Sequence, residues 1–118
     1  NYIESAWGNE KYELYNNSDI FVLPTNYIYE MQPISIIEAM SCGLPIISTN
    51  IGLIPSMVKH NVNGLILEDT KPENIANYIL KLMTNSELMS KMKIANVKKF
   101  DTNYSQEVFL KSIDKLIQ

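Results

Sequence analysis

Three short apolar runs stand out along the chain, each bounded by proline, glycine or polar residues. They are Ile20–Leu23, Ile46–Thr49 and Gly64–Leu67. The runs lack the alternation expected of a strand with one solvated face, so they are typical of parallel strands that are covered on both faces. We therefore predict three buried strands in one sheet.

Helical patterns fill the intervals between these strands. Lys11–Asn17 and Ile34–Met40 are expected to form helices, and Pro55–His60 is expected to form one or two helical turns. Gly43 and Pro45 follow the second segment and are common signals for the end of a helix. Strands and helices therefore alternate, an order that predicts an α/β domain with a parallel sheet.

The last part of the chain is expected to be helical throughout. One helix begins at Pro72, a second is capped by Asn85 or Ser86, and a third follows the polar residues Asp101–Asn103. We therefore predict a Rossmann-like parallel sheet with flanking helices and a helical C-terminal tail. The residues expected to face inward from these helices are Ile75, Ile79, Leu82, Leu88, Met89, Met92, Val108, Phe109, Ile113 and Leu116.

The composition narrows the classes of partner. A chain of 118 residues, of which 46% are hydrophobic, is enough for one small packed domain. Its net charge of −3 lacks the basic footprint of a nucleic-acid-binding protein. The 10 basic residues are all lysines, so no guanidinium fork for gripping phosphates is complete within this chain.

Other features indicate the compartment. The single Cys42 excludes an internal disulfide, fits a reducing environment and is expected to be a packing residue. No apolar run reaches the roughly 18 residues that span a bilayer, and no signal peptide is visible. We therefore expect a cytoplasmic protein. His60 is expected to be incidental. Tyr27 and Tyr29 flank the approach to Glu30; packing is the favoured role for both, and contact with a sugar is the alternative.

Two glutamates carry the candidate chemistry. Seven residues separate Glu30 from Glu38, and Pro33 stands between them at the predicted first position of the helix. Glu30 then lies in the loop at the positive end of the helix, where anionic groups bind readily. Glu38 lies inside an apolar run, where a carboxylate needs partners. Considered alone, Glu30 could equally complement the helix dipole, and Glu38 could be a solvated helix residue.

The surrounding motifs give this pair a specific context. In chain order they are Ser18–Thr25, Glu30-x7-Glu38, Ala39–Thr49, Gly52 and Asn63–Leu67. This order resembles the C-terminal, nucleotide-sugar-binding domain of the retaining family-four glycosyltransferases, which have the two-domain GT-B fold. The resemblance extends from about residue 10 to the end. The spacing of the glutamates is weak evidence alone, but it becomes specific when Ala-Met-x-x-Gly-x-Pro and a buried strand follow.

The resemblance implies a reaction and a role for each residue. It implies transfer of a sugar from a nucleotide donor such as a UDP- or GDP-sugar to a saccharide or lipid-linked acceptor, with retention of configuration and without a metal. It assigns Glu30 as the catalytic residue beside the transferred sugar and Glu38 as the ligand of the ribose hydroxyls. Backbone N–H groups that would face the sugar and the diphosphate belong to Met31, Gln32, Ile34 and Ser35.

The chain departs from the family pattern at two places. Met31 stands where glycine is usual, and Ser56 replaces a later acidic residue. We interpret both as tuning of the donor site, with Met31 narrowing the sugar pocket. They also favour an alternative, a non-catalytic glycosyltransferase-like subunit that binds a catalytic partner. An unrelated α/β signalling domain would need an acidic cluster at the strand ends, which the sequence lacks.

The resemblance also implies that residues 1–118 are an incomplete C-terminal half of a GT-B fold. The N-terminal acceptor domain is expected to be missing, together with the first strands of this domain and the basic pair that grips the diphosphate. In a sheet of order 3-2-1-4-5-6 the three predicted strands would be the last three, and Tyr2–Ala6 would be the third. We expect the edge of Ile20–Leu23 to be exposed in this fragment, and the fragment alone to be inactive.

For the whole protein we expect a role in bacterial polysaccharide biosynthesis. The expected location is the cytoplasm, with peripheral association at the inner face of the membrane, where a lipid-linked acceptor would be reached.

Overall fold

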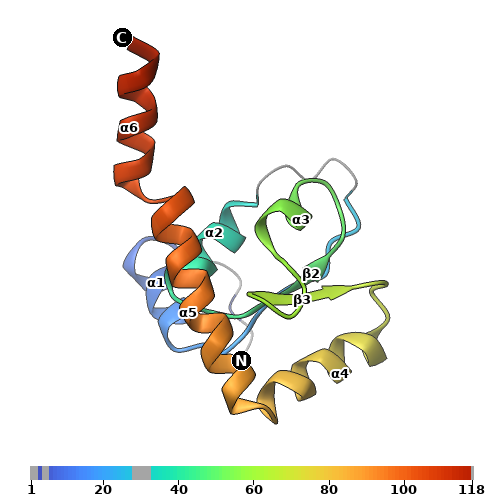
Figure 1. Cartoon of the computed structure of the whole chain (residues 1–118). Coiled ribbons are helices and arrows are strands. Elements are labelled where there is room, and N and C mark those ends of the chain that lie inside the picture. The colour runs from blue at the N-terminus through green and yellow to red at the C-terminus, as the bar shows by residue number, and fades with distance from the viewer. Residues whose placement is uncertain (1–2, 4–5, 28–32, 118) are drawn as a thin grey trace.

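The computed structural model describes residue 3, residues 6–27 and residues 33–117, apart from the side chains of residues 109, 112, 116 and 117. Strands and helices alternate in its first half, and its second half is helical (Figure 1). The elements are α1 (Asn9–Asn16), β1 (Phe21–Leu23), α2 (Ile34–Ser41), β2 (Ile46–Thr49), α3 (Ile54–Met57), β3 (Gly64–Leu67), α4 (Pro72–Met83), α5 (Ser86–Asn103) and α6 (Gln106–Ile117).

The three strands form one parallel sheet in the order β1-β2-β3. Phe21 pairs with Ile46, and Ile46 pairs in turn with Gly64. Helices α2 and α3 make the two crossovers between neighbouring strands, as parallel pairing requires. The predicted α/β fold with a parallel sheet is therefore confirmed, and β1 begins one residue later than expected.

The sheet is covered on both faces, as its apolar runs predicted. Neighbouring residues of a strand point to opposite faces, so Ile46 packs with the buried side chains of α2 and α3. Ile47 joins the opposite cluster, to which α4 contributes Leu82 and α5 contributes Met92. Both isoleucines are fully buried. In Figure 1, α5 runs from the end of α4 past α2 and so joins the two helical layers.

The end of α2 is set by a glycine. Gly43 has a positive φ of 73°, a conformation that costs glycine little. Its N–H donates to the carbonyl of Met40, and the N–H of Leu44 donates to the carbonyl of Ala39, both at 3.0 Å. These two bonds form a Schellman motif, and Leu44 is buried against the core as that motif favours. The predicted end of this helix is confirmed.

A buried pair of asparagines ties α5 to the sheet. Asn96 is fully buried, and its amide nitrogen donates to the carbonyl oxygens of Leu44 (2.8 Å) and Asn63 (2.9 Å). The Asn63 amide donates to the Asn96 side-chain oxygen (3.0 Å) and to the Met57 carbonyl (2.8 Å), and its oxygen accepts the Lys59 N–H. Every polar group of the pair is therefore satisfied without water. The spacing of apolar residues in α5 did not predict that Asn96 is buried.

Replacing Asn96 by leucine is expected to lower the free energy of unfolding by about 2 kcal/mol, because it leaves buried polar partners unpaired. The amide of Asn63 would keep its bond to Met57 but lose the one to Asn96, and the carbonyl of Leu44 would lose the Asn96 amide, while the side-chain volume is nearly retained. Urea denaturation measures the change. Asn77→Leu, at an exposed position of α4, is the matched control. A loss no larger than that of the control would contradict the structural role of Asn96.

The C-terminal helices differ from the sequence predictions in two details. Asp101–Asn103 precede the last helix, as predicted, but they form the final turn of α5 and do not cap α6. The cap of α6 is Ser105, whose hydroxyl oxygen accepts the N–H of Val108 at 3.3 Å. Ile113 does not face inward and is 37% exposed. The reason is visible in Figure 1, where α6 continues beyond the end of α5 and projects away from the sheet.

Two predicted core residues and the predicted cap of α5 are confirmed. Leu82 and Met92 are buried as predicted, and the side chain of Asn85 caps α5 by accepting the N–H of Leu88. The predicted inward orientation of Phe109 and Leu116 lies outside the described side chains. The predicted strand at Tyr2–Ala6 lies largely outside the described residues.

Candidate functional site

The carboxyl ends of the three strands meet at one edge of the sheet. Thr49, at the end of β2, is 4% exposed, and its hydroxyl donates to the carbonyl of Thr25, just beyond β1, at 2.6 Å. A pocket of about 420 Å³ lies at this edge. Its lining includes Asn26, Asn50 and Glu68, which follow or end the three strands. Ligands of open α/β sheets bind at such an edge, so this is the expected side for a site.

Helix α2 begins near the same edge because it follows β1. Pro33, predicted at the first helical position, is instead the residue before the helix, with φ −60° and ψ 117°. Its carbonyl accepts the N–H groups of Ile36 (3.0 Å) and Ile37 (3.4 Å). Pro33 therefore accepts the first hydrogen bonds of α2 although it lies just before the helix. Ile34 and Ser35 are then the first two helical residues, at positions where backbone N–H groups have no acceptor within the helix.

Three of the predicted site residues lie outside the described residues. Glu30, Met31 and Gln32 are in the segment that joins β1 to α2, and their roles stay predictions. The described part of the predicted site consists of Ile34 and Ser35 at the start of α2 and Glu38 in its second turn. The side chain of Ile34 is 72% exposed.

Glu38 is largely enclosed, and its charge has a partner. Its side chain is only 14% exposed, and Oε2 lies 2.7 Å from Nζ of Lys11 on α1. The interpretation of Glu38 as a solvated helix residue is therefore wrong, because α1 covers it. Helical side chains lean toward the N-terminus of their helix, so Glu38 leans toward the carboxyl edge of the sheet. This hydrogen bond raises the pKa of Lys11, which therefore stays charged.

Tyr15, also on α1, makes a second contact between α1 and α2. Its hydroxyl donates to the carbonyl of Ser35 at 3.4 Å, and its ring lies 6.0 Å from that of Phe21. Burial, together with the negative charge of Glu38, raises the pKa of Tyr15 to about 12. The phenol is therefore neutral at physiological pH. Sequence reasoning missed Lys11 and Tyr15, although their spacing of four places both on one face of α1.

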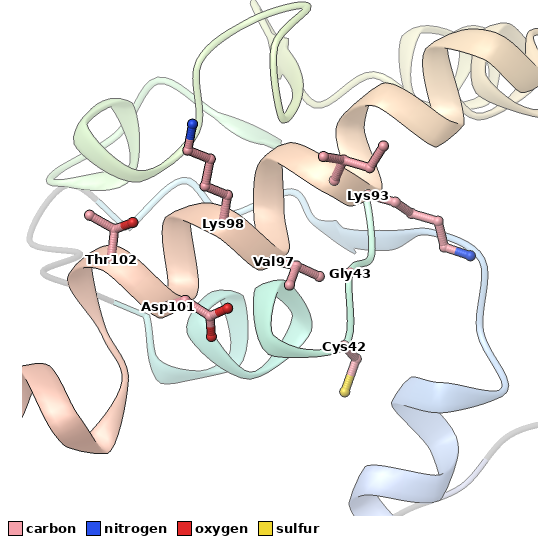
Figure 2. A pocket seen from close by; sticks show the side chains of 8 residues that line it. Cys42, Gly43, Lys93, Val97, Lys98, Asp101 and Thr102 are labelled. Atoms are coloured by element: carbon pink, nitrogen blue, oxygen red, sulfur yellow. The ribbon is translucent and has the colours of Figure 1, made fainter.

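A second, wider pocket lies away from this edge of the sheet. It encloses about 600 Å³ between the end of α2 and one face of α5, and Figure 2 shows Cys42, Val97 and Asp101 around it. Its lining includes none of the predicted site residues. Cys42 is a half-buried free thiol here, in accord with the packing role that the sequence indicated.

Other candidate groups have structural partners. Nδ1 of His60 accepts the N–H of Ile66 at 2.9 Å, and its ring lies 6.0 Å from that of Tyr78. Ser56, at the departure from the family pattern, donates to the carbonyl of Leu53 at 2.6 Å within α3. Within the described ranges, no group of three or more histidine, cysteine, aspartate or glutamate side chains could hold a metal ion. None of the described helices is long and apolar enough to cross a bilayer.

The parallel sheet, the crossover helices and the enclosed carboxylate on α2 define a Rossmann-like domain with its candidate site at the start of a helix. Residues 1–100 match the family of glycosyl transferases group 1. The chain belongs to this family.

Relatives of this chain are much longer than the chain itself. The amylovoran biosynthesis glycosyltransferase AmsK of Erwinia amylovora is 25% identical over 107 residues, which are 87% of this chain and 26% of AmsK. The UDP-Gal:alpha-D-GlcNAc-diphosphoundecaprenol alpha-1,3-galactosyltransferase of Escherichia coli is 31% identical over 83 residues, which are 70% of this chain and 21% of that protein. The chain therefore spans about a quarter of the length of these relatives.

Solved structures show the same fold. HepE of Anabaena in complex with UDP superposes with a TM-score of 0.80 at 18% identity, over 89% of this chain and 29% of HepE. The C-terminal domain of the group 1 glycosyl transferase LpcC of Francisella tularensis gives 0.74 at 24% identity, over 90% of this chain and 52% of that domain. The predicted likeness to part of the C-terminal domain of a GT-B fold is thereby confirmed.

Proposed function

We propose that this chain is the donor-binding part of a retaining glycosyltransferase. The whole protein would transfer a hexose from a UDP- or GDP-sugar to a saccharide or lipid-linked acceptor, without a metal cofactor. An N-terminal domain of the same protein would supply the acceptor site. The relatives support sugar transfer as the class of reaction, and HepE supports a nucleotide donor because its structures contain UDP and UDP-glucose.

The observation that carries this proposal is the enclosed carboxylate of Glu38. A carboxylate that is 14% exposed, on the helix that follows β1, can accept hydrogen bonds from two neighbouring hydroxyl groups at once. The ribose of a nucleotide offers such a pair. Glu30, eight positions earlier, would lie beside the transferred sugar and stabilise positive charge that develops at its anomeric carbon.

Backbone N–H groups at the start of α2 would bind the parts of the donor that the two carboxylates do not contact. In the proposal, the N–H groups of Ile34 and Ser35, with those of Met31 and Gln32 before them, face the sugar and the diphosphate. The positive end of the helix dipole would favour the leaving diphosphate. Met31 would narrow the sugar pocket, because glycine at that place would let a ligand approach more closely.

Replacing Glu38 by glutamine in the complete protein is expected to weaken binding of UDP or GDP roughly thirtyfold. The variant loses the charge that strengthens two hydrogen bonds to the ribose, and such bonds are worth about 1.5–3 kcal/mol each. Isothermal titration with each nucleotide measures the change. Glu87→Gln, which removes the carboxylate of an exposed ion pair with Lys91, is the matched control and should bind like the natural protein.

Two outcomes would contradict the proposal. Equal affinities of the Glu38→Gln variant and the natural protein would remove Glu38 from the donor site. Failure of the complete natural protein to bind UDP, GDP or their sugars would instead favour the non-catalytic subunit that Met31 and Ser56 suggest.

A further inference from the structure

We propose that Lys11 is a positioning residue of the donor site, which holds the carboxylate of Glu38 in the orientation that receives the ribose hydroxyls. This inference rests on the proposed function of Glu38. It adds a residue from α1, outside the loop and helix that carry the predicted site. The ion pair between the two residues is the observation that carries it.

This ion pair differs from the others in the described part of the chain. The other two, Lys91–Glu87 and Lys111–Glu107, join residues four apart on one helix, and their side chains are 70–81% exposed. Exposed pairs of that kind contribute little to stability. Lys11 and Glu38 instead join two helices at 2.7 Å, with Glu38 only 14% exposed. The Lys11 side chain is 37% exposed, so only the Glu38 end of the pair is enclosed. Removing Lys11 would leave the carboxylate of Glu38 without its charged partner, so the contact constrains the orientation of Glu38.

The geometry leaves Glu38 able to bind a ligand. Lys11 contacts Oε2, and an ionised carboxylate offers about four acceptor sites in all, so sites remain for two hydroxyl groups. The same contact holds the carboxylate of Glu38 beside α1. Without Lys11, the carboxylate would turn toward water, and the ribose would lose its partner.

The surrounding packing holds Lys11 in place. Tyr15 lies one helical turn after Lys11 on α1, and its hydroxyl donates to the carbonyl of Ser35 on α2. The contact joins the same two helices as the ion pair. Tyr15 also contacts Phe21 of β1, so α1 is anchored to the sheet next to the ion pair. Tyr15 therefore anchors α1 next to Lys11, in a helix that has no fully buried residue of its own.

The test uses the complete protein and two kinds of nucleotide. Lys11→Ala is expected to weaken the binding of UDP, or of GDP if that is the base preferred, about tenfold in isothermal titration. The affinity for the 2′,3′-dideoxy form of the same nucleotide should change less than twofold, because that ligand makes no ribose contact with Glu38. Lys11→Arg should retain UDP affinity within about threefold, since it keeps the positive charge.

The outcomes separate this inference from the proposed function. Lys91→Ala, which breaks an exposed pair, is the control and should bind both nucleotides normally. An equal loss for UDP and its dideoxy form would show a phosphate contact or general damage and would overturn the positioning role. If Lys11→Ala binds UDP normally while Glu38→Gln binds it weakly, the positioning role of Lys11 is overturned and the proposed role of Glu38 stands. If Glu38→Gln also binds normally, or the natural protein binds no nucleotide, both proposals fail.

Discussion

Replacing Glu30 by glutamine in the complete protein is expected to reduce turnover about a thousandfold while changing the affinity for UDP less than about threefold. A preorganised charge beside a developing carbocation acts mainly in the transition state, and removing one such group typically costs a hundredfold to a thousandfold. A thousandfold loss corresponds to about 4 kcal/mol in activation free energy. Steady-state rates with the sugar nucleotide, together with nucleotide titration, separate the two effects.

The contrast with Glu38 makes this experiment specific. Glu38→Gln should mainly weaken nucleotide binding, whereas Glu30→Gln should mainly slow the chemical step, because the proposal places only Glu30 at the reacting bond. Glu13→Gln, at an exposed position of α1, is the matched control. Turnover of the Glu30 variant within threefold of the natural protein would remove Glu30 from the catalytic site. A product of inverted anomeric configuration would show that the reaction is not retaining.

Replacing Gly64 by alanine is expected to lower the free energy of unfolding by about 3 kcal/mol or more. A Cβ atom at this position would overlap the carbonyl oxygen of Ile46 and would come within 2.7 Å of Cγ1 of Val58. The first contact is with backbone that is paired in the parallel ladder, so the sheet itself would have to move. Forcing extra atoms into a packed core usually costs about 1–3 kcal/mol, and here the obstructing atom is not a flexible side chain.

Urea denaturation of the two proteins measures this loss. Ser90→Ala, at an exposed position of α5, is the control. If Gly64→Ala unfolds at the same urea concentration as Ser90→Ala, the close packing of β3 against β2 is refuted.

Much of the fold followed from local patterns. Ile46–Thr49 and Gly64–Leu67 were predicted with the bounds that the structure has, because short apolar runs between turn signals leave little choice. Gly43 ends α2 as predicted, since only glycine adopts its backbone conformation cheaply. The cap of α5 was also among the two residues proposed.

The errors occurred where a helix end or a helix face depends on what surrounds it. Asp101–Asn103 have the composition of a loop, but they continue α5 by a further turn. Ile113 has the spacing of a core residue, yet α6 leaves the sheet and Ile113 stays exposed. Periodicity reports which side of a helix is apolar. It does not report whether another element covers that side.

For the candidate site as well, the sequence predicted some features and could not predict others. The spacing of Glu30 and Glu38 and the motifs around them were sufficient to recognise the family, and the match over residues 1–100 confirms it. The placement of Lys11 against Glu38 was not predictable, because 27 positions separate the two residues and no periodicity links them. The same holds for Asn96 and Asn63, which meet 33 positions apart in the core.

The sequence by itself determined the order of strands and helices, the ends of several elements and the family, since these depend on neighbouring residues and on motifs in a set order. Only the tertiary structure decided that Glu38 is enclosed, that Lys11 balances its charge and that Asn96 is buried. Those facts depend on which surfaces of distant elements meet. Burial then determines whether a polar side chain is solvated or must find a partner within the protein.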